Sequence, residues 1–104
     1  MAAEGQPVYR RIVLKVSGEG LAGEDGSTIS PEALAHVTRE IADAVEAGVQ
    51  VAVVVGGGNI VRGAKLAGPL GVAELTAHHM GMEATVINAL ALRDSLESRG
   101  ISSH

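Results

Sequence analysis

The sequence predicts an α/β fold of three layers, in which helices cover both faces of a parallel-type sheet. Residues 51–55 are four valines and one alanine, and β-branched side chains on both faces of a strand are typical of a sheet buried between helices. A second apolar segment, residues 12–16, comes earlier in the chain, and an amphipathic helical pattern separates the two. This strand, helix, strand order predicts parallel strands joined by a right-handed crossover.

The first expected strand, residues 11–16, contains a lysine near its carboxyl end. A lysine in a buried strand is costly unless its ammonium group reaches an anion or water. Lys15 could therefore face a bound phosphate, with Ser17 and Gly18 turning the chain beside it. It could equally be an edge residue whose ammonium group extends into solvent. The residues alone leave both readings open.

A loop and a helix follow this strand. Residues 18–28 contain four glycines and are expected to form no regular element. Ser30-Pro31-Glu32 is a strong helix start, with a capping hydroxyl, a proline at the first helical position and an acid in the first turn. Gly48 is expected to end the helix, and the second strand is expected at residues 49–55. The residues that share the apolar helical face are Leu34, Val37, Ile41, Ala44 and Val45.

Three glycines, residues 56–58, come directly after the valine strand. Open α/β sheets bind ligands at the carboxyl ends of their strands, and a backbone without Cβ atoms lets several N–H groups approach an anion. Arg62 adds a positive charge nearby. If the two strands are parallel neighbours, Lys15 and the glycines share one crevice, which suits binding and transfer of a phosphoryl group.

These features also have simpler explanations. The glycine run could be a tight turn, and Arg62 could be an ordinary surface arginine. The run fits the dinucleotide-binding fingerprint poorly, because Val61 occupies the third glycine position, and no Walker-type Gly-Lys-Ser/Thr follows it. His78 and His79 are adjacent, so they point apart on a helix, and no metal site is predicted.

The remaining sequence predicts a short helix from Val72 and a longer helix at residues 81–98 that stops at Gly100. Residues 101–104 are expected to begin a third strand. Such a sheet leaves an edge and much apolar surface unpaired, so we expect association with a partner or with further parts of a larger domain. The residues expected on the buried side of the long helix are Met82, Val86, Ile87, Leu90 and Ala91.

Composition narrows the function classes. The 104 residues include no cysteine, so no disulfide framework is expected, and a cytoplasmic location fits. No secretory signal or membrane-spanning run is seen, and residues 1–9 are expected to be a flexible arm. A net charge of −4, with one tyrosine and no Phe or Trp, argues against a nucleic-acid partner. The core must be built from Val, Ile, Leu, Ala and Met.

Nearly the whole chain resembles the N-terminal part of bacterial UMP kinases, which belong to the amino acid kinase superfamily. The glycine run suggests the superfamily, and the His-Met-Gly-Met segment points to the UMP kinases within it. The resemblance implies an amino acid kinase-like (carbamate kinase-like) αβα domain that is incomplete here. The matching segments are residues 9–19, 56–59, 62–63, 79–82, 84–88 and 92–94.

The resemblance implies transfer of the γ-phosphoryl group of ATP to UMP, giving UDP in pyrimidine nucleotide biosynthesis, with Mg²⁺ accompanying the nucleotide. Lys15 would stabilise the transferred group, and Gly57 would contact UMP. The residues implied on the ATP side are Lys15, Val16, Ser17, Gly18, Gly58 and Arg62. The residues matching a segment linked to GTP activation in some members are Gly23, Glu24, Asp25, Gly26, Ser27 and Thr28. Homo-oligomers, typically hexamers, and regulation by GTP or UTP are also implied.

Two departures from the family pattern stand out. Members usually have Gly-Asp before His-Met-Gly-Met, and that aspartate helps to hold the UMP sugar, whereas Ala77 and His78 occupy these positions here. Members are also more than twice as long. The chain alone is therefore expected to be inactive or nearly so. The alternatives are a non-catalytic half-domain that binds nucleotide or joins oligomers, and a kinase of another small acceptor in the same superfamily.

Overall fold

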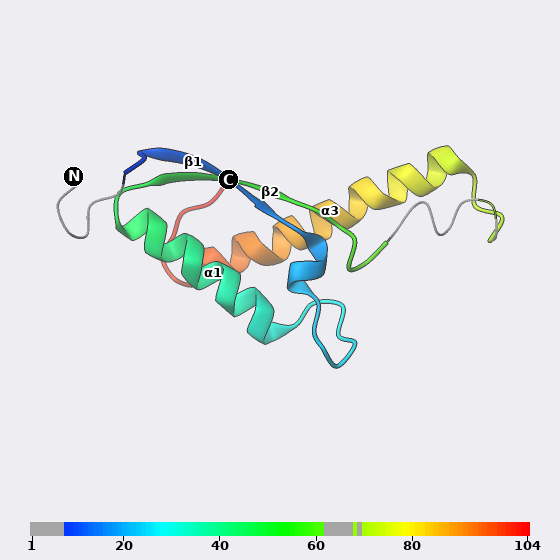
Figure 1. Cartoon of the computed structure of the whole chain (residues 1–104), viewed down its shortest axis with the longest axis horizontal. Coiled ribbons are helices and arrows are strands. Elements are labelled where there is room, and N and C mark those ends of the chain that lie inside the picture. The colour runs from blue at the N-terminus through cyan, green and yellow to red at the C-terminus, as the bar shows by residue number, and fades with distance from the viewer. Residues whose placement is uncertain (1–7, 62–67, 69) are drawn as a thin grey trace.

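The computed structural model describes residues 8–61, 68 and 70–104, and Figure 1 shows the order of elements. A strand (β1, Arg11–Val16) leads through a 3-10 turn (η1, Gly18–Leu21) to a helix (α1, Pro31–Glu46). A second strand (β2, Gln50–Val55) and a long helix (α3, Glu74–Glu97) follow. Most of the expected N-terminal arm lies outside the described residues.

The two strands pair in parallel along their whole length, as predicted. Their register runs from Arg11 opposite Gln50 to Val16 opposite Val55, and the Arg11 Nε donates a 2.6 Å hydrogen bond to the Gln50 side-chain oxygen. In-register parallel pairing brings the carboxyl ends of both strands to the same edge of the sheet. The loops that follow Val16 and Val55 therefore lie next to each other at that edge.

Helix α1 begins and ends where its capping residues predict. The Ser30 hydroxyl oxygen accepts a 3.2 Å hydrogen bond from the Ala33 N–H, and Pro31 is the first helical residue. Gly48 has a φ of 95°, a conformation that costs glycine little, and the next N–H, of Val49, donates 3.0 Å to the Ala44 carbonyl oxygen. The second strand starts one residue later than expected.

The segment expected to be a loop contains one short regular element. The Ser17 hydroxyl oxygen accepts from the Glu19 N–H at 3.2 Å and so caps η1. Leu21, at the end of this turn, has no exposed surface. A local cap and one anchoring leucine therefore suffice to form a 3-10 turn despite the glycines.

The helices α1 and α3 cover one face of the sheet, and the opposite face is bare (Figure 1). Ile41 of α1 packs with Leu92 and Leu96 of α3 against the inward side chains of both strands. On the other face Val13 is 72% exposed and Val54 57% exposed. The expectation of strands buried on both faces is therefore wrong for this chain, which forms two of the three layers of an αβα fold.

Helix α3 corrects two expectations. It is one helix from Glu74, so the predicted short and long helices are a single element that continues through Gly81. Its buried side is also not the expected one. The five buried residues are Ala77, Ala84, Asn88, Leu92 and Leu96, whereas Met82, Val86, Ile87 and Leu90 are each 47% exposed or more. The predicted face thus points away from the core.

Two opposite sides of α3 are apolar, which explains the error. The stripe formed by Leu75, Met82, Val86 and Leu90 lies about half a turn from the buried stripe, given 100° per residue. The buried stripe is made of small residues and an asparagine as well as leucines. Hydrophobic periodicity favours the larger side chains, so it selects the exposed stripe.

The C-terminal residues do not form the expected third strand. Helix α3 ends as predicted before Gly100, whose φ is 82°, and the Ile101 N–H donates 3.1 Å to the Leu96 carbonyl oxygen. Residues 101–104 then run without strand pairing. Ile101 packs against the core. None of the described helices is long and apolar enough to cross a membrane.

Candidate functional site

The loops that follow β1 and β2 touch at the carboxyl edge of the sheet. A Cβ atom placed on Gly18 would lie 2.5 Å from the Gly58 nitrogen, 2.8 Å from the Asn59 Oδ1 and 3.0 Å from the Gly56 oxygen. The Gly56 N–H donates 2.9 Å to the Val16 carbonyl oxygen, which extends the strand pairing into the loop. The glycine at position 18 is therefore required for the two loops to meet.

Gly57 fits against helix α3 in the same way. A Cβ atom here would lie 2.8 Å from the Ala84 Cβ and 2.9 Å from the Thr85 nitrogen. At Gly58 the nearest atom would be the Glu19 Cγ, at an ordinary 3.8 Å. Two of these glycines thus serve close backbone packing, which a simple tight turn would not require, while Gly58 leaves space.

The glycine loop, residues 56–59, offers backbone donors. The Ile60 and Val61 N–H groups both donate to the Gly57 carbonyl oxygen, at 3.0 and 3.1 Å, which closes one turn. Within the described residues, the N–H groups of Gly57 and Gly58 donate no hydrogen bond. Unpaired N–H groups at a strand-to-turn junction are the kind of donors that bind phosphate oxygens.

Lys15 lies on the bare face of the sheet, opposite Val54, and is exposed. Its ammonium group therefore has access to water, so the cost expected for a lysine in a buried strand does not arise in this chain. Val16 faces the helices and is buried, whereas Ser17 is exposed and caps η1. Lys15 and the glycine loop share the carboxyl edge, as their parallel strands require.

Two asparagines that the sequence reasoning did not single out join the site together. The fully buried Asn88 of α3 donates from Nδ2 to the Gly56 carbonyl oxygen at 2.8 Å and to the Asn59 Oδ1 at 2.7 Å. Asn59 donates back to the Asn88 Oδ1 at 3.2 Å and to the Thr28 carbonyl oxygen at 2.8 Å. The sequence signal that could have identified Asn88 is its position as a polar residue within an otherwise apolar stripe of the helix.

Residues 23–28 form a compact turn built on one carboxylate. The Asp25 Oδ1 accepts from the Ser27 N–H at 3.0 Å and from the Ser27 hydroxyl at 2.5 Å. The hydroxyl bond first, and the N–H bond second, hold the pKa of Asp25 below its ordinary value of 3.8. The Gly23 N–H donates 2.8 Å to the Ser27 carbonyl oxygen and closes the turn. Through Thr28, this segment reaches the glycine loop.

His78 lies in the second turn of α3, and its side chain is 63% exposed. Its Nε2 is 3.6 Å from the Glu74 carboxylate one turn earlier. It precedes Thr85 by seven residues, which places both on the same side of the helix, about 10 Å apart along the axis. Arg62 lies outside the described residues. Among the described residues, no three His, Cys, Asp or Glu side chains cluster as a metal site.

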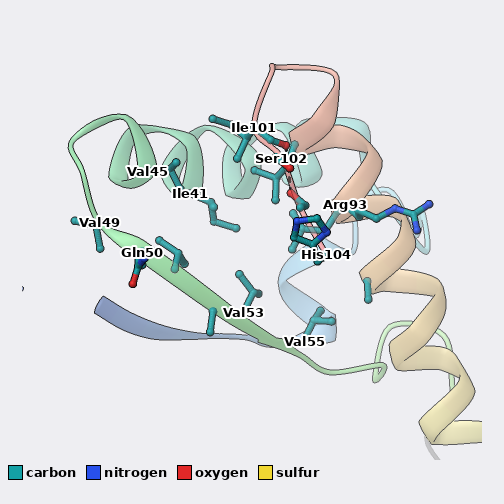
Figure 2. A pocket seen from close by; sticks show the side chains of 16 residues that line it. Ile41, Val45, Val49, Gln50, Val53, Val55, Arg93, Ile101, Ser102 and His104 are labelled. Atoms are coloured by element: carbon teal, nitrogen blue, oxygen red, sulfur yellow. Dashed lines mark hydrogen bonds between the residues drawn. The ribbon is translucent and has the colours of Figure 1, made fainter. Parts of the chain in front are cut away.

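A groove of about 700 Å³ lies away from these residues, along β2 (Figure 2). It is lined by consecutive residues 49–53 of the strand region, by α1 and α3, and by residues 101–104. Lining by consecutive strand residues means that the groove follows the free edge of β2. None of the predicted site residues lines it, so it is a gap beside an unpaired strand edge and not the candidate site.

Comparison with known proteins identifies the family. The model of the amino acid kinase family matches residues 10–104. The chain belongs to the amino acid kinase family. The strands, glycine loop and helices described above lie within the residues that match.

Relatives within the amino acid kinase family are consistent in their names. Uridylate kinase of Haemophilus influenzae is 57% identical over 91 residues, which are 88% of this chain and 38% of that protein. Uridylate kinase of Methylococcus capsulatus is 54% identical over 95 residues, 91% of this chain and 39% of that protein. The chain thus spans less than two fifths of the length of these relatives.

Solved structures agree with this assignment. UMP kinase from Bacillus anthracis matches with a TM-score of 0.79 and 38% identity, covering 86% of this chain and 36% of that one. UMP kinase from Ureaplasma parvum matches with a TM-score of 0.72 and 35% identity, covering 88% and 39%. The two layers seen here are therefore a portion of the amino acid kinase fold.

Proposed function

We propose that this chain supplies the phosphate-binding portion of a UMP kinase, which transfers the γ-phosphoryl group of ATP to UMP in pyrimidine nucleotide synthesis. An oxygen of the UMP phosphate forms a bond to the γ-phosphorus, the bond to the ADP oxygen breaks, and UDP and ADP are released. The observation that carries the proposal is the contact of two glycine turns at the carboxyl edge of parallel strands, in a chain whose relatives are named uridylate kinases.

The proposed ATP side combines a cation with backbone donors. Lys15 neutralises charge on the transferred group, and the Gly58 N–H binds a phosphate oxygen. Positioning and charge neutralisation account for most catalysis of phosphoryl transfer, so such groups suffice for this part of the site. The other residues proposed on this side are Val16, Ser17, Gly18 and Arg62.

UMP is proposed to contact Gly57 and to approach the side of α3 that carries His78. Mg²⁺ is proposed to be held through the nucleotide phosphates. Activation by GTP through residues 23–28, regulation by UTP, a homo-oligomeric and typically hexameric assembly, and a cytoplasmic location complete the proposal.

Calorimetric titration of the chain with ATP tests the phosphate-binding role. We expect Lys15→Ala to weaken ATP binding about tenfold, as for loss of a charged hydrogen-bonding partner. Arg11→Ala is the matched control, because Arg11 lies on the same bare face at the opposite end of β1. Equal affinity of Lys15→Ala and the wild type would refute the assigned role of Lys15.

An assay for UDP separates catalysis from binding. We expect no appreciable ATP-dependent UDP formation by the chain alone, because much of the positioning that drives transfer is missing. Activity is expected when the chain is joined to the remaining part of a relative, and Lys15→Ala should abolish it. UDP formation by the isolated chain would contradict the expectation of inactivity.

A second candidate is a non-catalytic half-domain that binds nucleotide or joins the oligomers of a full-length relative. The bare sheet face favours it. Thermal protection of the chain by ATP, with no product in the completed protein, would support it. The third candidate is a kinase of another small acceptor, which stays open because His78 occupies the position of the usual aspartate. Comparison of UMP, CMP and acidic amino acids as acceptors in the completed enzyme would distinguish it.

A further inference from the structure

The asparagine bridge, formed by Asn59 and Asn88, uses every hydrogen-bonding group of its two amides. Each Nδ2 donates two hydrogen bonds and each Oδ1 accepts one, at distances of 2.7 to 3.2 Å. No buried side-chain nitrogen or oxygen in the described part of the chain lacks a partner. Asn88 is fully buried and Asn59 is partly exposed, and in a satisfied polar network a change in one member leaves another without its partner.

The bridge adds side-chain hydrogen bonds to a backbone that is rich in glycine. Glycine has the greatest conformational freedom of any residue, so three in succession define a loop poorly unless something outside fixes it. Asn88 fixes the Gly56 carbonyl from helix α3, and Asn59 fixes the other end of the loop. Gly58, whose N–H the proposed function assigns to phosphate binding, and Gly57, which it assigns to UMP, lie between these two anchors.

The same bridge reaches the turn at residues 23–28. Asp25 orders Ser27 through two hydrogen bonds, and the next residue, Thr28, presents its carbonyl oxygen to Asn59. The path from Asp25 to the glycine loop therefore consists of these hydrogen bonds and the peptide bond between Ser27 and Thr28. Because Asn59 uses one donor for Thr28 and the other for Asn88, we expect a displaced Thr28 carbonyl to change the position of the amide.

We propose that the asparagine bridge is a positioning device that sets the shape of the glycine loop and transmits to it the state of residues 23–28. Its importance for phosphate binding rests on the proposed function. Asn59 and Asn88 are positioning residues in this account, since they act on a ligand through the backbone of the glycines.

The transmission can be measured without any ligand, from the backbone ¹⁵N and ¹H shifts of Gly56, Gly57 and Gly58 in the whole chain. We expect Asp25→Ala to shift these resonances, and we expect the shift to disappear when Asn59→Ala is also present. Asn59→Asp keeps an oxygen for the Asn88 Nδ2 but removes the donors to the Thr28 carbonyl and to the Asn88 Oδ1, so it should also interrupt the effect. A shift that persists in both backgrounds would overturn the proposal.

A matched control separates positioning from general stability. Thr38 is as fully buried as Asn88, and its hydroxyl lies 2.8 Å from that of Ser95 across α1 and α3, away from the glycine loop. Asn88→Ala and Thr38→Val should both lower the melting temperature. Only Asn88→Ala should weaken ATP binding, by about tenfold. Equal weakening in both variants would contradict a positioning role.

The results that would refute the proposed function differ from those that would refute the transmission through the asparagine bridge. If the wild-type chain binds neither ATP nor inorganic triphosphate while Asp25→Ala still shifts the glycine resonances through Asn59, the bridge stands and the phosphate-binding role falls. If ATP binds but Asp25→Ala leaves the glycine resonances unchanged, the function stands and the transmission falls.

Discussion

Single glycines decide whether the candidate site can form. Gly18 and Gly57 each lie where a Cβ atom would collide with backbone, at Gly58 and at Thr85 respectively, and backbone cannot move aside as a flexible side chain can. Gly81 differs, since nothing lies within 4 Å of the position of its Cβ. The same residue type therefore has opposite roles at these positions.

A pair of substitutions tests this difference. We expect Gly57→Ala to lower the free energy of unfolding by about 1–3 kcal/mol, as overpacking does. Gly81→Ala should raise it by about 0.5–1 kcal/mol, because alanine favours a helix interior over glycine. Urea unfolding followed by far-ultraviolet circular dichroism measures both. A Gly57→Ala protein as stable as the wild type would disprove the close contact with α3.

The carboxylate of Asp25 gives its turn a defined pH dependence. Because the folded pKa lies below the ordinary value of 3.8, the contribution of Asp25 to stability is fully present above pH 3.8. It is lost as the pH falls through the lower folded value. We expect the Ser27 amide resonance to titrate with a midpoint below 3.8. A midpoint at or above the ordinary value would show that the Ser27 bonds do not favour the charged form.

At the scale of elements, helix α3 carries the sharpest difference between prediction and structure. Two leucines two residues apart differ in burial, with Leu92 4% exposed and Leu90 47% exposed. The sequence pattern favours Leu90 as the core residue. The structure assigns the core to Leu92, which packs with Ile41 of α1.

Alanine substitution distinguishes the two sides of α3. We expect Leu92→Ala to cost about 2–5 kcal/mol of unfolding free energy, the usual cost of truncating a buried leucine. Leu90→Ala should change it by about 0.5 kcal/mol or less, as at exposed sites. The comparison is matched, because both variants remove the same atoms from the same helix. The reverse order would mean that the chain in solution buries the other side.

Local signals explain which elements were predictable. Ser30, Pro31 and Gly48 fix α1 through hydrogen bonds between near neighbours, and the glycine loop follows from its own residues. The Asn59–Asn88 bridge joins residues 29 apart, and no short-range pattern specifies such a pairing. The exposure of Lys15 likewise depends on whether a second layer covers the sheet, which residues 11–16 do not encode.

At the scale of the whole molecule, the chain is extended for its length. Its radius of gyration is 16.2 Å, whereas a compact domain of this size has about 13 Å. Its accessible surface is 7140 Å², about 1,700 Å² more than the roughly 5,400 Å² expected for a folded monomer of its mass. One partner in a standard interface buries about 800 Å². The excess is therefore enough for more than one contact.

We expect this surface to cause association of the purified chain. Sedimentation velocity over a range of concentrations should show species larger than the monomer, and the thermal transition should be broad. Val86→Lys places a charge on the exposed apolar stripe of α3 and should reduce association, whereas Thr76→Lys adds the same charge at an exposed polar position of that helix. A monodisperse, cooperatively melting monomer would contradict this expectation.

The aliphatic core has an optical consequence. The sequence contains one tyrosine and no tryptophan or phenylalanine, and Tyr9 lies before β1 with 70% of its surface exposed. Its phenol ring has nearly the same surroundings in the folded and unfolded chain. Absorbance and emission near 280 nm therefore stay almost constant through unfolding, and the peptide groups report the transition. A tryptophan introduced in place of a core residue would report packing that the natural chromophore does not detect.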